Sequence, residues 1–253
     1  MEVSPDIAEQ IENTWTISRA FLSALKFVVL DSARDSKYFD NHLLAYLAQD
    51  YIQSVVSLSV LTHGGIHNTC RRELRFLLEM SIKLCYIQQS QPGSAVAVKL
   101  DIFKNTLEST NISMQKKIDL NLLPESVRAQ FYSDVGRFYG ETSQYVHLTQ
   151  EQILERMSQV NAGRSSGFEA ASDVERLNSL IGRGTALALV FLFHSIPQYV
   201  VGDWLVRKDG QCLNWFYSKS KYIAHMDEHF DDKHERQDKA TEIKKARWAM
   251  VRF

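Results

Sequence analysis

Prolines and glycines, which end helices and form tight turns, are scarce in this chain: its 253 residues include 4 prolines and 11 glycines. An all-β fold needs a turn roughly every ten residues, and this supply is too small for one. Long helices need such residues only near their ends. The sequence therefore predicts an all-α protein.

Apolar residues recur at helical spacing along most of the chain, which supports this prediction. Ser4-Pro5-Asp6 is a favourable helix start, because Ser caps a helix and Pro is tolerated in its first turn. Residues 108–119 are polar and predict a loop. The predicted helices cover residues 7–29, 40–61, 67–89, 95–107 and 124–147, a short segment after Thr149, residues 172–206 with a kink at Pro197, and residues 215–226.

One stretch divides the chain. Residues 161–167 (NAGRSSG) are small and polar and predict a flexible linker. We expect an up-and-down helical bundle in residues 1–160. Residues 161–253 are expected to add C-terminal helices that pack on this core, giving one compact domain overall.

The composition limits which cellular compartment and which binding partners we expect. The net charge of −1 gives no global attraction to nucleic acid or to an anionic membrane, so such contacts would need a local patch. Cys70, Cys85 and Cys212 lack CxxC spacing and predict free thiols in a reducing compartment. The acidic N-terminus has no signal region, and the apolar run 186–193 is too short to span a bilayer. We expect a cytoplasmic protein without a cofactor and without membrane contact, and a buried helix at 186–193.

A polar stripe in residues 124–147 is the first candidate for chemistry. Tyr139, Ser143 and His147 recur every four positions, on the side away from Phe131 and Phe138. His147 can act as a general base near neutral pH, with Ser143 or Tyr139 to orient it. Alternatively, His147 only stabilises the C-terminal end of its helix. Ser143 is not expected to be a nucleophile, because no triad carboxylate and no Gly-x-Ser-x-Gly elbow accompany it.

A charged stretch is the second candidate. Arg71-Arg72-Glu73-Leu74-Arg75, followed by Glu79, lies in a helical apolar pattern. Arg75 and Glu79 are four residues apart and can pair, which would hold a guanidinium ready for a phosphate or carboxylate. The alternative is a solvated charged face on a packing helix.

These segments resemble the HEPN superfamily (higher eukaryotes and prokaryotes nucleotide-binding) of helical proteins. The resemblance covers residues 46–157 and rests on Gly64-Gly65, residues 71–79, Tyr86-Ile87 and residues 139–147. It implies a helical bundle that often dimerises, with polar residues of two central helices meeting in a cleft. Many members are ribonucleases of toxin–antitoxin or anti-phage systems, and others only bind nucleotides or partner proteins.

The HEPN ribonuclease signature, an Arg followed by a His after four to six residues, does not occur in this chain. Arg34 and His42 have seven residues between them, and Arg137 and His147 have nine. A catalytic site would be a divergent one, built from Arg71, Arg75, Glu79, Ser143 and His147.

A third candidate lies near the C-terminus. His225-Met226-Asp227-Glu228-His229 fits the H-x-x-E-H form of a zinc site. Its alternative is a solvent-facing helix end in a charged tail. The tail itself interleaves basic residues with Trp248 and Phe253, which suits either RNA or a packing partner.

Three functions follow as hypotheses. The first is a HEPN-like effector that acts on or binds nucleic acid, as a divergent ribonuclease in phage defence or toxin–antitoxin function. The second is a non-catalytic module that binds a nucleotide or a protein. The third is a metal-dependent hydrolase that uses His225 and His229. The expected partners are RNA or a nucleotide, a second copy of the chain, or another protein.

Overall fold

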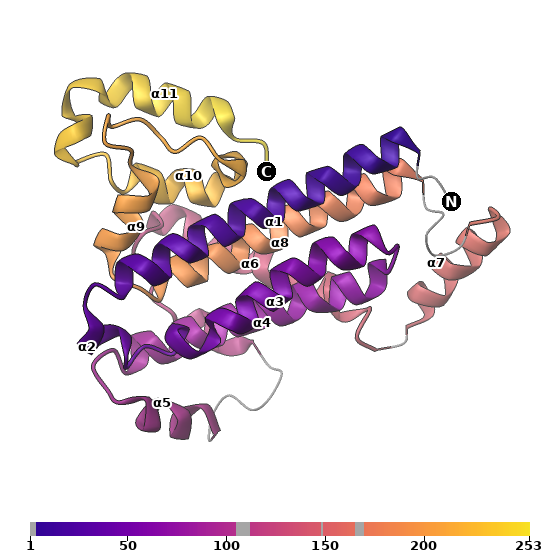
Figure 1. Cartoon of the computed structure of the whole chain (residues 1–253), viewed down its shortest axis with the longest axis horizontal. Coiled ribbons are helices and arrows are strands. Elements are labelled where there is room, and N and C mark those ends of the chain that lie inside the picture. The colour runs from indigo at the N-terminus through magenta and orange to yellow at the C-terminus, as the bar shows by residue number, and fades with distance from the viewer. Residues whose placement is uncertain (1–3, 105–111, 148, 165–169) are drawn as a thin grey trace.

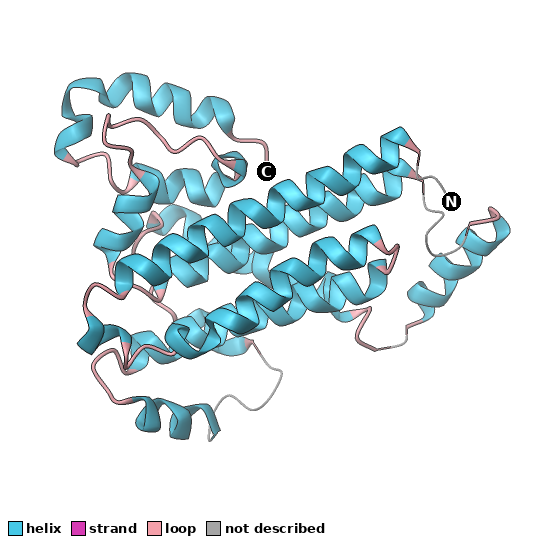
Figure 2. Ribbon diagram, viewed as in Figure 1, coloured by secondary structure: helices cyan, strands magenta, loops and turns pink. Residues whose placement is uncertain are grey.

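The computed structural model describes residues 4–104, 112–147, 149–164 and 170–253. Within these residues the regular structure is helical and no strand occurs (Figure 2). The α-helices are α1 (Pro5–Ser32), α2 (Ser36–Phe39), α3 (Leu44–His63), α4 (His67–Ser90), α5 (Val96–Ile102), α6 (Glu125–Ser143), α7 (Gln150–Asn161), α8 (Ala171–His194), α9 (Gln198–Leu205), α10 (Lys221–Glu228) and α11 (Ala240–Met250). Short 3-10 helices are η2 (Ser113–Lys117), η3 (Phe216–Lys219) and η4 (His234–Lys239). The prediction of an all-α fold is confirmed.

Four long helices form the centre of the molecule (Figure 1). α1 packs against α3, α3 against α4, α4 against α8, and α8 against α1, which closes a four-helix bundle. Successive helices α1, α3 and α4 run alternately up and down, and α8 returns parallel to α1 (Figure 1). α6 packs on the outside of α4. Because α8 belongs to this bundle, the core draws on residues from both sides of the 161–167 linker.

Helix α8 is central because its second half, from Ala186 to Phe193, is apolar on every side. The residues from Ala186 to Phe193 are each at most 5% exposed. A helix that is apolar all round must be covered all round. α8 is the one helix in the described part of the chain that is long and apolar enough to cross a membrane, and 89% of its most apolar window is buried inside the protein. The prediction of a buried helix at 186–193 is confirmed.

Helix boundaries differ from the prediction where capping decides them. α1 begins at Pro5, and the Ser4 side chain accepts a hydrogen bond from the Ile7 amide at 3.4 Å, as expected. The expected kink at Pro197 is instead a complete break, because α8 ends at His194 and α9 begins at Gln198. Pro lacks an amide hydrogen and disfavours helical geometry in the residue before it. Part of the predicted 108–119 loop is the helix η2, and residues 108–111 and 165–167 of the predicted loop and linker lie outside the described residues.

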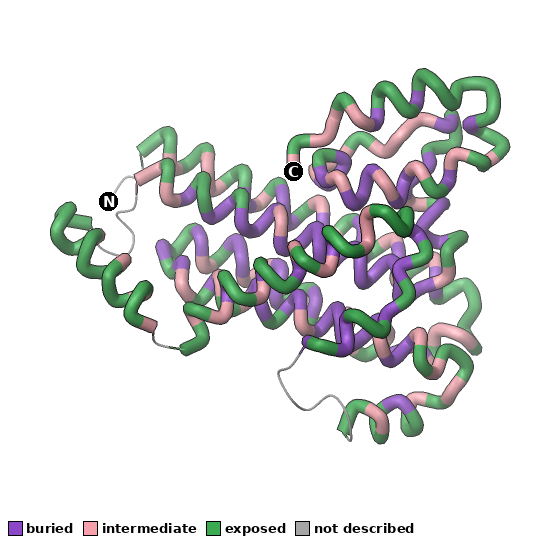
Figure 3. Tube along the Cα trace, turned by 180° about the vertical axis from the view of Figure 1, so that it is seen from behind, coloured by how far each residue is buried: buried purple, intermediate pink, exposed green. Residues whose placement is uncertain are grey.

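The C-terminal helices form a small unit on one side of the bundle (Figure 1). α9 packs on α1, α10 packs on α8, and α11 packs on α10. At the opposite end, α7 stands apart from the bundle and is exposed along most of its length (Figures 1 and 3). These two regions differ in how they are held, and α7 borders the predicted site.

Candidate functional site

Arg75 points from α4 into the contact with α6. Its side chain is almost buried, at 7% exposure. The guanidinium lies over the Tyr139 ring, 4.5 Å from the ring centre, and Nη2 donates to the Tyr139 hydroxyl at 2.7 Å. Nη1 is buried and has no hydrogen-bond partner among the described residues. Arg75 is therefore held by an aromatic ring, with one donor left unsatisfied.

Glu79 is not the partner of Arg75. It forms an ion pair with Lys83 at 2.7 Å, and both side chains are largely buried. A glutamate that precedes a lysine by four residues is the favourable orientation on a helix, whereas the Arg75–Glu79 order is the weaker one. The predicted Arg75–Glu79 pair is thus replaced by a Glu79–Lys83 pair further along α4.

Arg71 lies one turn before Arg75 and uses a second tyrosine. Its guanidinium lies 4.4 Å from the centre of the Tyr145 ring, and Nη1 donates to Asn68 Oδ1 at 2.8 Å. Nη2 lies 3.7 Å from Glu155 Oε1, and the Tyr145 hydroxyl donates to Glu155 Oε2 at 3.1 Å. Burial raises the pKa of Tyr145, which keeps its hydroxyl a donor. These contacts join α4, the end of α6 and α7.

The polar stripe of Tyr139, Ser143 and His147 does not survive as a single helical face. α6 ends at Ser143, so His147 lies in the following turn, where it is exposed. Its imidazole makes no hydrogen bond with any described residue. The Ser143 hydroxyl donates to the Tyr139 carbonyl of its own helix at 2.5 Å. The structure therefore brings Arg71 and Arg75 onto tyrosines, but makes no hydrogen bond between them and Ser143 or His147.

Tyr145 and Glu155 are the site residues that the sequence analysis missed. Tyr145 falls on the apolar face of the predicted helix, and Glu155 follows a predicted helix start. Their contacts with Arg71 join residues that are 74 and 84 positions apart in the chain. Local spacing carries no signal for such pairs.

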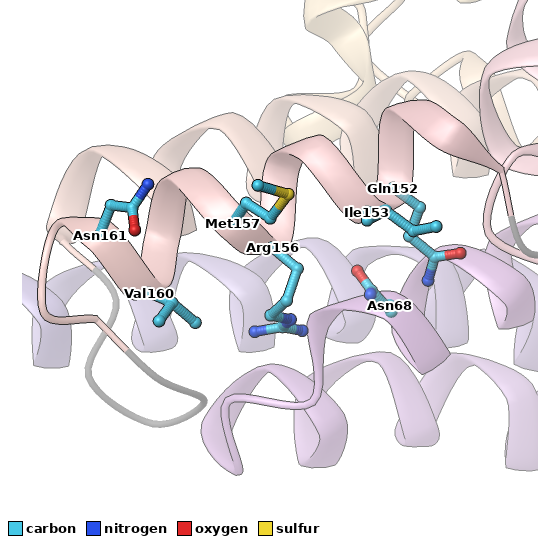
Figure 4. Close-up of a pocket in the computed structure, with 7 residues that line it drawn as sticks. All are labelled: Asn68, Gln152, Ile153, Arg156, Met157, Val160 and Asn161. Atoms are coloured by element: carbon cyan, nitrogen blue, oxygen red, sulfur yellow. The ribbon is translucent and has the colours of Figure 1, made fainter.

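A groove of about 390 Å³ lies between α7 and the start of α4 (Figure 4). Figure 4 shows Arg156 and Val160 directed from α7 toward the bundle, and Asn68 facing Gln152. Ile153 and Met157 also line it.

α7 is capped as expected, because the Thr149 side chain accepts a hydrogen bond from the Gln152 amide at 3.2 Å.

His225 and His229 lie at the end of α10, where each contacts an aromatic ring. The His225 ring meets Trp248 at 4.7 Å and the His229 ring meets Phe230 at 5.1 Å. Burial lowers the pKa of His225, so its ring is neutral at pH 7. Among the described residues, no group of three or more His, Cys, Asp or Glu side chains is placed to hold a metal ion. The three cysteines are free thiols, as expected.

No family model matches the chain, and no curated protein and no solved structure is significantly similar to it.

Proposed function

We propose that the protein is a non-catalytic interaction module that binds a protein partner through α7. The observation that carries this proposal is the anchoring of α7. Arg71, Tyr145 and Glu155 hold the helix beside the bundle, yet its apolar side chains stay in solvent. In this interpretation the charged stretch of α4 positions a docking helix.

The exposed side chains of α7 are large and adjacent. The four are Ile153, Leu154, Met157 and Val160, which are 46%, 53%, 54% and 62% exposed. α7 has no buried residue at all. Covering apolar surface releases about 25 cal/mol per Å², and adjacent exposed apolar residues are typical of interaction sites.

The side chains proposed for catalysis either bond to other parts of the protein or have no neighbour that orients them. The Ser143 hydroxyl is bonded to its own helix, and Arg71 and Arg75 are stacked on tyrosines. No described residue orients His147. General acid–base catalysis needs a base in hydrogen-bonding reach of its proton donor and held there. The geometry supports binding better than turnover.

A second copy of the chain is the partner that supplies a matching surface. Ile153, Met157 and Val160 have the alternating four- and three-residue spacing of a helix-pairing seam. Two α7 helices, each about 18 Å long, pair favourably when antiparallel because their dipoles then oppose. A contact of this size is at the small end of stable interfaces, so we expect micromolar association. The HEPN resemblance also implies dimers.

Light scattering coupled to size-exclusion chromatography, from low to high micromolar protein, tests this proposal. We expect a concentration-dependent dimer that Met157→Glu weakens by about tenfold or more, because a carboxylate enters an apolar contact. Leu100→Glu on α5 is the matched control, since Leu100 and Met157 are both 54% exposed. A wild-type monomer at every concentration, or a dimer that Met157→Glu leaves intact, would contradict the proposal.

A nucleic-acid effector is the second candidate, as a divergent ribonuclease in phage defence or toxin–antitoxin function. One observation favours it: Arg72 and His147 are both exposed, and the Arg72 guanidinium donates to the Tyr145 carbonyl, two residues before His147, so both can meet a phosphate backbone. RNA turnover by the purified protein, lost in His147→Ala and in Arg75→Ala, would establish this function in place of the first.

A further inference from the structure

A second cavity, far from α7, lies where α6, α8 and α10 meet. It has a volume of about 210 Å³ and is formed by segments distant in the sequence. Its apolar floor consists of Phe138, Ala186 and Leu187, each at most 5% exposed. The rim is polar and charged. A cavity with an apolar floor and a few converging polar groups is the usual form of a ligand site.

The single carboxylate in the cavity already has its partners. Asp134 Oδ2 accepts from the Tyr222 hydroxyl at 2.5 Å and from Lys221 Nζ at 3.1 Å. Its Oδ1 accepts from Gln130 Nε2 at 2.8 Å. Burial raises the pKa of Asp134, but these hydrogen bonds outweigh burial and the net shift is downward. Asp134 is thus ionised and contributes one negative charge.

The cationic groups exceed this charge. Arg137, Arg183 and Lys221 line the cavity, so three cations against one carboxylate leave two positive charges. The remaining contacts of the arginines are loose: Arg137 lies 3.7 Å from Asp134, and Arg183 lies 3.6 Å from Glu141 at the surface. Arg183 can therefore turn to a ligand at small cost.

The N-terminus of α10 lies at the same place, and its first amide, that of Lys221, already donates to the Phe253 carbonyl at 2.7 Å. Ser220 is the N-cap residue, but its side chain makes no capping hydrogen bond. Ser220 is 1% exposed and lines the cavity, and its hydroxyl makes no hydrogen bond with a described residue. A helix N-terminus favours an anion through its dipole and through those amides that have no acceptor yet. The Ser220 hydroxyl beside it can donate a further hydrogen bond to such an anion.

We propose that this cavity binds a compact organic phosphate monoester. A phosphate dianion matches the two excess positive charges, the Ser220 hydroxyl and the α10 terminus, and a small apolar or aromatic body covers the floor. The volume is below the roughly 300–1,000 Å³ of sites for drug-sized ligands, so the ligand is small. This site is independent of α7 and of the proposed dimer.

Isothermal titration calorimetry with phenyl phosphate tests the site on the full chain. We expect saturable binding, weakened about tenfold by Arg183→Gln and by Ser220→Ala, because each removes a charge-assisted hydrogen bond. Arg176→Gln, an exposed position on the same helix α8 outside the cavity, should bind as the wild type does. Equal thermal midpoints of the unliganded variants show that their folds are unchanged.

Two further ligands separate the parts of the proposal. Inorganic phosphate should bind more weakly than phenyl phosphate because it leaves the apolar floor uncovered. Benzoate should bind more weakly because it carries one charge. The proposal is overturned if phenyl phosphate gives no saturable binding, if Arg183→Gln binds it equally well, or if inorganic phosphate or benzoate binds as tightly.

Discussion

Helices α7 and α11 have nearly equal lengths, 12 and 11 residues, and each is joined to the rest of the molecule through charged side chains. The two helices nevertheless differ in how far their side chains are buried. α7 has no buried residue, and its anchor Glu155 is 36% exposed. α11 buries Ile243 and Arg247. The charges near α7 remain in contact with water, whereas those of α11 are removed from it.

The network under α11 satisfies its charges almost completely. Asp227 accepts from Arg236 Nη2 at 2.7 Å and from Arg247 Nε at 2.6 Å, and Asp231 bonds both arginines. Arg236 also donates to the Gly210 carbonyl at 3.0 Å. Burial lowers the pKa of Arg247, but its bonds to the two aspartates outweigh burial and raise it.

A buried network of this kind fixes one geometry, because any partial opening leaves a charge without a partner. An exposed anchor such as Glu155 can open at little cost, because water replaces the lost contact. The comparison suggests that the C-terminal unit is a rigid part of the fold, and that α7 can adjust to a partner.

Removing the centre of the buried network should have the largest effect. Asp227→Ala leaves Arg236 and Arg247 without their shared carboxylate, and we expect a loss of about 3–5 kcal/mol in the free energy of unfolding. Urea unfolding measures the loss. Asp232→Ala, at a neighbouring exposed position, is the control and should change stability little. A loss in Asp227→Ala no larger than in the control would show that the network is not rigid.

Acid should weaken the bundle that carries both regions. Each of two buried histidine rings donates one hydrogen bond to a carbonyl and accepts one from an amide: His42 from Leu44 and His194 from Leu122. Burial lowers the pKa of each to about 4, below the roughly 6.5 of an unfolded histidine. Between these values only the unfolded chain takes up the proton, so stability is complete above pH 6.5 and falls toward pH 4.

At pH 5 the expected loss is about 2 kcal/mol for each histidine. His42→Gln and His194→Gln should flatten the pH dependence of the urea midpoint between pH 7.5 and 5. An unchanged slope in both variants would mean that other groups cause the acid loss.

The cost of replacing a glycine by alanine can be compared between the two regions. Gly163, after α7, and Gly210, in the C-terminal unit, both have positive φ, 69° and 78°. A Cβ at Gly210 would lie 2.0 Å from the Glu235 carbonyl oxygen, whereas nothing lies within 4 Å of one at Gly163. Gly163→Ala should cost about 1 kcal/mol through φ alone, and Gly210→Ala about 3 kcal/mol. Equal losses in thermal unfolding would remove the distinction between the regions.

The smallest expected effect on stability is at the α7 anchor. Glu155→Gln should cost under about 1 kcal/mol, because the ion pair with Arg71 is partly exposed. Hydrogen exchange in α7 should nevertheless accelerate, and the proposed dimer should weaken. Glu151→Gln, on an exposed position of the same helix, is the control. A protected α7 in Glu155→Gln would show that another contact holds the helix.

Local pattern was enough to predict the helices whose boundaries depend on local chemistry. α1 begins at its Ser-Pro cap, and α4 covers nearly the predicted range because glycines precede it and Pro92 follows it. The pairings between helices were not predictable in this way. The segment around Asp227 suggested either a zinc motif or a solvent-facing helix end. The second alternative is wrong for Asp227, which is 5% exposed, because Arg236 and Arg247 arrive from later helices.

The position of α8 in the chain has a consequence for synthesis. The stripes of α1 and α4 that α8 covers are made before α8 leaves the ribosome. Until α8 is made, the apolar faces of α1 and α4 that it will cover stay exposed. Incompletely folded intermediates expose apolar surface in the same way. The bundle therefore closes only after a late segment of the chain has been made. Pulse-labelled chains that stall before Ala171 should bind chaperones, whereas chains released after His194 should not.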